Sequence, residues 1–153
     1  MGIRMTTKLS EVHDMLMREA ERVDRLTIRA LCELGEECVG RVRDRAGDKS
    51  WYDQSGNLRS SVGYVIAHNK NIIQYSAFNQ VKQGSEGVKT GKDLAKELAK
   101  RYSNNYVLIV VAGMNYAEFV EAMDNKDVLA STELWAREQV PLMLEKLKRQ
   151  IAK

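Results

Sequence analysis

The sequence predicts an α+β fold in which a long N-terminal helix packs on a small, mainly antiparallel sheet, with a middle helix and a C-terminal helix. Three observations indicate this fold class. An apolar stripe of helical period covers the first third of the chain, two alternating runs flank a polar turn near residue 70, and a β-branched run follows near residue 110. The 153 residues are enough for one domain, so we expect a single domain over residues 1–153.

Residues 9–46 are expected to form the long helix, because their apolar side chains recur at steps of three or four residues. Such a helix would rise about 55 Å, and Ser10 is its expected N-cap. Gly35 and Gly40 lie inside the pattern, and each costs about 1 kcal/mol relative to alanine in a helix. Two shorter helices with a break at these glycines are therefore the alternative.

The next two segments are expected to be a loop and a β-hairpin. Residues 45–59 are rich in turn formers, among which Trp51 and Tyr52 are the expected aromatic anchors. Residues 60–80 alternate apolar and polar side chains on both sides of the polar turn at residues 69–71. Two alternating runs around a polar turn predict a hairpin.

Residues 81–92 contain three glycines and three lysines, which predicts a loop that is mobile in the isolated protein and becomes ordered on assembly. Thr90 is the expected cap of a middle helix over residues 93–102. Residues 106–112 are almost wholly apolar, as in a strand that is covered on both faces. A short helical turn over residues 115–121 and a short edge strand at residues 128–129 are expected after it.

The last helix is expected to begin at Ser131 or Thr132, either of which can cap it. Leu134, Trp135 and further leucines supply its apolar surface. Pro141 removes one hydrogen bond inside the helix and should kink it.

Composition excludes several classes of protein. The longest apolar run is far shorter than the roughly 18 residues of a membrane span, and the first 25 residues lack the apolar core of a secretory signal, so we expect neither. The net charge of +3 is too small to indicate nucleic acid as a required partner. Cys32 and Cys38 would lie about 9 Å apart along a helix, too far for a disulfide, and free thiols fit a reducing cytoplasm.

Catalytic and metal-binding patterns are also missing from the sequence. The pair Gly91-Lys92 resembles the end of a phosphate-binding P-loop, but Glu86 occupies the first glycine position and Asp93 replaces the hydroxyl that would bind magnesium. The two histidines belong to no catalytic constellation and no metal-ligand spacing. We therefore expect no enzyme, no cofactor and no metal, and a hydrolase with an unrecognised site stays open as an alternative.

Two segments resemble a known family. Residues 53–62 resemble the Ser/Thr-Gly-x-Leu-Arg-x-Ser-Ile/Val signature of the tail-component family of tailed bacteriophages, and residues 111–121 resemble that family's Val-Gly-x-x-Tyr-Ala-x-Phe/Tyr-Val-Glu segment. The chain departs from the family after the second segment, where the common Phe-Gly-Thr turn is absent. The matching positions are Ser55, Gly56, Leu58, Arg59, Ser61, Tyr116, Ala117, Val120 and Glu121.

The resemblance implies a structural protein of the phage neck, which completes the tail or joins it to the head and is often encoded by a prophage. It implies an α+β fold, self-association into a ring that is commonly six-fold, and phage tail-tube and head-connector proteins as partners. It also implies the host bacterial cytoplasm as the place of assembly and the virion as the final location.

The residues themselves allow specific expectations for such a protein. Gly56 permits a turn, Leu58 fills the core, and Arg59 pairs with Glu118 or Glu121. The expected assembly contacts are Lys82, Lys89, Lys92 and Trp135. A small nucleic-acid-binding or regulatory module that uses the basic region 82–101 is the alternative.

Overall fold

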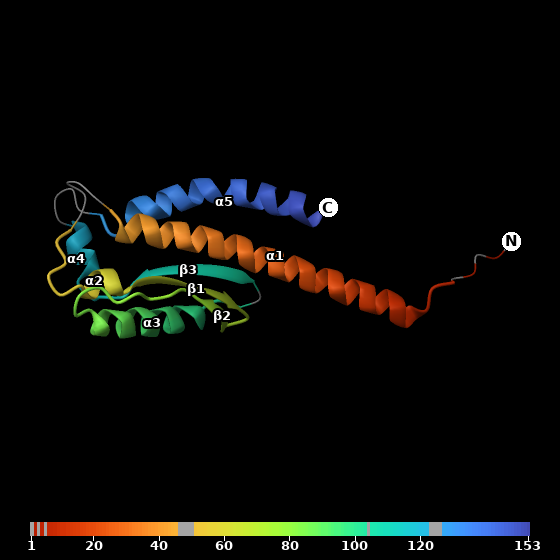
Figure 1. Cartoon of the computed structure of the whole chain (residues 1–153), viewed down its shortest axis with the longest axis horizontal. Helices are drawn as coiled ribbons and strands as arrows, with labels where there is room; N and C mark the ends of the chain where they lie inside the picture. Colours follow the sequence, from red (N-terminus) through yellow and green to blue (C-terminus); the bar gives the residue numbers. More distant parts are fainter. Residues whose placement is uncertain (1, 3, 5, 46–50, 104, 123–126) are drawn as a thin grey trace.

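The computed structural model describes the chain except residues 1, 3, 5, 46–50, 104 and 123–126. It confirms the α+β fold, with α5 lying on α1, α1 on one face of the sheet, and α3 on the other face (Figure 1). The elements are α1 (Leu9–Arg43), α2 (Asn57–Ser60), β1 (Val62–His68), β2 (Asn71–Tyr75), α3 (Ser85–Ala99), β3 (Tyr106–Ala112), α4 (Ala117–Ala122) and α5 (Ala130–Ile151).

The N-terminal helix α1 is continuous, so the alternative of two helices is wrong. Only a glycine fits at position 35 of this helix, because a Cβ atom there would lie 2.7 Å from the ring of Tyr64. The glycine lets α1 approach the sheet closely. Ser10 is the second residue of the helix, and the N-cap is Lys8.

The sheet of the described residues has the strand order β2-β1-β3, and both pairs are antiparallel. The expected hairpin is confirmed, and it turns through Asn69 and Lys70, whose φ angles of 51° and 67° are left-handed. Its second strand ends at Tyr75, before the expected boundary. The central strand β1 is almost fully buried, with Tyr64 packing toward α1 and Val65 toward α3.

The middle helix begins at Ser85, well before the expected residue 93, so the expected loop over residues 81–92 is wrong from residue 85 onward. Residues 85–92 form the first two turns of α3, and Thr90 lies inside the helix with its hydroxyl donating to the carbonyl of Glu86. Gly87 and Gly91 are buried. A Cβ atom at Gly87 would lie 2.0 Å from the carbonyl oxygen of Asn57, so the glycines permit helix and chain to touch backbone to backbone.

The C-terminal third of the described chain follows most of the expected order. Strand β3 and helix α4 are confirmed. The expected edge strand at residues 128–129 is wrong, because Val128 is a fully buried core residue in the segment before α5. The expected cap at Ser131 or Thr132 is also wrong, since the carboxylate of Glu121 accepts the N–H groups of Leu129 and Ala130 at the start of α5. Helix α5 continues through Pro141 as a bowed helix (Figure 1).

Candidate assembly interface

The two segments that resemble the phage family meet at one corner of the fold. The backbone N–H of Gly113 donates to the hydroxyl of Ser61 at 3.0 Å, which joins the end of β3 to the start of β1. Tyr116 and Val120 share a hollow of about 310 Å³ with Ser55 and Leu58. Segments separated by some fifty residues therefore form one structural unit.

A buried carboxylate shapes the first of these segments. Asp53 accepts the N–H of Gly56 at 3.0 Å and the N–H of Arg59 at 2.8 Å. Gly56 has a φ of 81°, a left-handed conformation that favours glycine. Leu58 is 1% exposed, as expected of a core residue. The motif is thus a turn that leads into the short helix α2 and holds Leu58 in the core.

The expected ion pair of Arg59 is wrong. The guanidinium lies 4.8 Å above the ring of Trp51 and donates to the carbonyl oxygens of Trp51 and Arg43. No ion pair joins it to Glu118 or Glu121 in the part of the chain that the structure describes. Arg59 therefore connects the end of α1 to the segment before α2.

The second motif segment packs around the same corner. Ala117 and Val120 of α4 are half-buried against the core cluster on the α1 side of the sheet. Burial raises the pKa of Tyr116, the charges of Asp53 and Glu86 raise it further, and a hydrogen bond from Ser55 opposes them. Its phenol is therefore neutral at physiological pH. The corner is a packed structural unit with few exposed motif side chains.

The four expected assembly contacts occupy different environments. Lys82 donates to the carbonyl of Asp53 at 2.6 Å and lies 5.3 Å from the ring centre of Tyr52, so it closes the motif corner. Trp135 is half-buried, with the guanidinium of Arg41 4.4 Å above its ring, and it holds α5 on α1. Lys89 and Lys92 lie on α3, whose Gly87 and Gly91 touch that corner.

A basic face runs along α3. Lys89, Lys92, Lys96 and Lys100 recur at steps of three or four residues, opposite the small residues that pack on the sheet. Carboxylates flank this face, because Asp93 lies 3.9 Å from Lys96 and Glu97 pairs with Arg101 at 3.0 Å. The positive electrostatic potential at this face is therefore weaker than the four lysines alone would produce.

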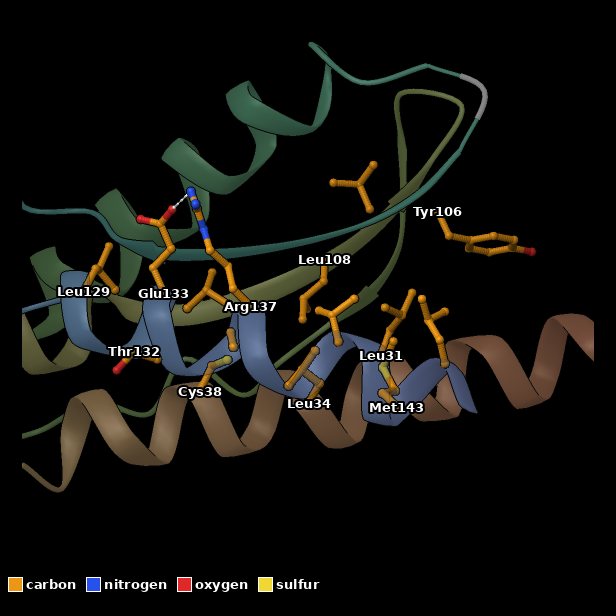
Figure 2. A pocket seen from close by; sticks show the side chains of 15 residues that line it. Leu31, Leu34, Cys38, Tyr106, Leu108, Leu129, Thr132, Glu133, Arg137 and Met143 are labelled. Carbon is orange, nitrogen blue, oxygen red and sulfur yellow. Dashed lines mark hydrogen bonds and ion pairs between the residues drawn. The ribbon is translucent and has the colours of Figure 1, made fainter. Parts of the chain in front are cut away.

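An apolar groove of about 620 Å³ lies between α1, α5 and β3 (Figure 2). Its floor is α1, one wall is α5, and the other wall is the edge strand β3. Glu133 and Arg137 are its two charged lining residues, and both belong to α5. The sequence could not reveal this groove, because it exists only where α5 lies on α1 beside β3. Its main lining residues are Leu31, Leu34, Cys38, Leu108, Val140 and Met143.

A second apolar surface lies on the N-terminal half of α1, which extends beyond the sheet and α5 (Figure 1). Leu9 and Leu16 are 75% and 65% exposed, and Met15 and Met17 are at least half exposed. Several large apolar side chains exposed on one bare stretch of helix are typical of an interaction surface.

The described residues also limit the chemistry of the site. They contain no group of three or more histidine, cysteine or acidic residues placed to hold a metal ion. Burial raises the pKa of the Cys38 thiol, and Glu37 raises it further while Arg41 opposes them, which disfavours the reactive thiolate. None of the helices within the described ranges is long and apolar enough to cross a membrane.

The sequence matches no family model, and neither a curated protein nor a solved structure is similar to it. The resemblance to phage tail components therefore depends on the two motif segments.

Proposed function

We propose that this chain is a structural assembly protein of the neck of a long-tailed bacteriophage, where it forms a ring that completes the tail or joins it to the head. The observation that carries the proposal is the apolar surface that a single copy leaves exposed on the outer face of α5, where large leucine side chains remain uncovered. Such surfaces are typical of proteins that associate. The motif resemblance supplies the kind of assembly.

The meeting of the two motif segments supports the resemblance at the level of the fold. A motif that shapes one part of a fold can occur in proteins that share this fold although the rest of their sequences differ. Asp53 and Ser61 form such a corner here, because their side chains accept hydrogen bonds from the backbone N–H groups of Gly56 and Gly113.

A ring requires two different patches on each subunit, because its contacts are heterologous. We assign one patch to the outer face of α3, with Lys89 and Lys92. The other is the outer face of α5, where Leu134 and Leu142 are each 64% exposed. The expected partners are further copies of the chain, the tail tube and the head connector.

Deletion of the gene from an intact phage or prophage, followed by electron microscopy of the lysate, tests the proposal. We expect unjoined heads and tails, or tails with defective ends, and recovery with the wild-type gene supplied in trans. The variant Leu142→Asp should not restore normal particles, because it places a charge on the assigned α5 patch. Normal infectious particles without this protein would exclude the proposal.

The basic face of α3 favours a second candidate function, binding to nucleic acid. Four lysines on one helix face can contact successive phosphates, and such binding weakens steeply with salt. Titration of a DNA duplex at several salt concentrations, with Lys89→Glu and Lys96→Glu as variants, tests it. Binding that does not change in these variants would exclude this face as the site.

A further inference from the structure

The exposed surface of α1 and the floor of the apolar groove are two halves of one helix face. Their positions follow one another along α1 at steps of three or four residues, the period of an α-helix. The face comprises Leu9, Val12, Leu16, Ala20 and Val23, which we call the ridge, then Thr27, and then Leu31, Leu34 and Cys38, which form the groove floor.

The two halves differ because α5 covers only one of them. The guanidinium of Arg22 donates to the carbonyl oxygens of Gln150 and Ile151, at the end of α5. Residues of α1 beyond Arg22, toward the N-terminus, therefore have no α5 beside them, so the ridge from Leu9 to Ala20 lies beyond α5, whereas Val23 is half-buried (Figure 1). On the other side of this point, α5 and β3 rise as walls and turn the same face into a groove (Figure 2).

We propose that the groove receives the ridge of a second copy of this chain, in a two-fold symmetric dimer whose α1 helices run antiparallel. Turning one copy end for end about an axis near Val23 and Thr27 places each ridge over the partner's groove. Leu16 of one copy then lies over Leu34 of the other. The ridge then covers the exposed side chains at the rim of the partner's groove, where Val140 and Leu144 are 37% and 43% exposed, and the contact is isologous.

The chemistry of both surfaces favours this occupant. The ridge presents apolar side chains at the spacing of a helix that binds in a groove. The groove is lined by aliphatic side chains, and Glu133 and Arg137 form an ion pair with each other at 2.6 Å, so no unpaired charge faces an apolar ligand. A foreign helix in the groove would leave the ridge exposed, whereas a second copy covers both.

The two α1 helices must run antiparallel because the ridge and the groove floor lie on the same face of α1. A parallel, staggered pair would cover one ridge and leave the other free, and it would grow into an open filament. The inference does not depend on the proposed phage role, because the patches assigned to the ring lie on α3 and on the outer face of α5.

Sedimentation of the purified full-length chain tests the dimer. Leu16→Asp should weaken dimerisation about a hundredfold or more, because two leucines per dimer lose their burial. Ile73→Asp is the matched control, since Ile73 is 42% exposed on β2 and does not line the groove, and this variant should stay dimeric. Unchanged circular dichroism would show that both variants fold. A monomeric wild-type chain at high concentration, or a Leu16→Asp variant that dimerises normally, would overturn the proposal.

Disulfide cross-linking tests the direction of the helices. Val23→Cys lies near the proposed axis, so two copies should cross-link readily under mild oxidation. Leu9→Cys lies at the far end of the ridge, where the antiparallel dimer keeps the two copies apart, and it should not cross-link. The wild-type chain, with Cys32 and Cys38, gives the background. Cross-linking through Leu9→Cys and not through Val23→Cys would overturn the antiparallel arrangement.

Discussion

Gly87 and Gly91 allow α3 to lie directly on the backbone of the chain around α2. A Cβ atom at Gly91 would lie 2.4 Å from the carbonyl oxygen of Ser61, and one at Gly87 would lie even closer to Asn57. Because the nearest atoms belong to the backbone in both cases, a methyl group at either position would force α3 away from the chain around α2. We expect Gly87→Ala and Gly91→Ala each to lower the free energy of unfolding by about 2–3 kcal/mol, measured by chemical denaturation.

Gly40→Ala is the matched control, because Gly40 also lies within a helix. The nearest atom to its Cβ position is the Asp44 carboxylate oxygen at 4.0 Å, so the methyl group has room. The substitution should raise the free energy of unfolding by about 0.5–1 kcal/mol, the helix preference for alanine. Equal effects at Gly40 and Gly87 would contradict the close backbone contact.

Tyr64 should make the stability of the folded protein depend on pH in the alkaline range. Burial raises the pKa of this phenol, and the hydrogen bond that it donates to Glu36 at 2.9 Å raises it further. In the unfolded chain the group ionises near pH 10, whereas the folded chain keeps its proton. Stability should therefore be complete below about pH 10 and fall as the pH rises above it, because only the unfolded state releases the proton there.

Tyr64→Phe tests this dependence. The variant should lose less stability than the wild type between neutral pH and alkaline pH, measured as the change in the free energy of unfolding. Tyr75→Phe, at a side chain that is 44% exposed, should keep the wild-type dependence. The same alkaline decline in all three proteins would mean that Tyr64 does not control it.

At the scale of elements, α5 depends on a buried ion pair for its position on α1. Arg45 and Asp127 are 12% and 13% exposed and lie 2.8 Å apart, and Arg45 also donates to Ser131 and Thr132. Asp127→Ala would leave a buried guanidinium without its carboxylate. We expect it to cost about 2–4 kcal/mol in the free energy of unfolding and to speed hydrogen exchange in α5.

The exposed pair of Glu145 and Lys148 offers the control for this prediction. Its side chains are 59% and 72% exposed, so solvent screens the charges. Glu145→Ala should change the free energy of unfolding by less than about 1 kcal/mol. A larger loss in Glu145→Ala than in Asp127→Ala would contradict the role of the buried pair.

The sequence predicted those elements whose period is unambiguous. The steps of three or four residues identified α1, and alternation identified the hairpin. Glycine content is a misleading signal at the start of α3, because a glycine-rich segment favours a loop in the sequence whereas these glycines lie in a helix. The signal was their spacing: Gly84, Gly87 and Gly91 continue into Ala95 and Ala99 at steps of three or four residues, which indicates a helix that packs closely through small residues.

The candidate site was predictable only in part. The two motif segments could be marked in the sequence, and Gly56 and Leu58 have the expected turn and core positions. The partners of Arg59 could not be predicted, because they are backbone carbonyls and a ring brought close by tertiary packing. The groove likewise depends on contacts between helices far apart in the chain. Val128 shows the same limit, since a buried apolar residue need not lie in a strand.

At the scale of the whole molecule, the chain combines a packed body with a helix that extends beyond it (Figure 1). The body buries a core on both faces of the sheet, whereas the ridge of α1 and the outer face of α5 remain exposed. The face of α1 is suited to a two-fold dimer, and the outer faces of α3 and α5 are suited to heterologous contacts. We therefore interpret the molecule as a subunit whose surfaces serve assembly.

Cryo-electron microscopy of phage particles released from cells that carry this gene tests the proposed neck role most directly. The account predicts a closed ring of copies at the head-proximal end of the tail, each with the layered arrangement of α5, α1, the sheet and α3. A complete neck that contains no copy of this fold would contradict the account.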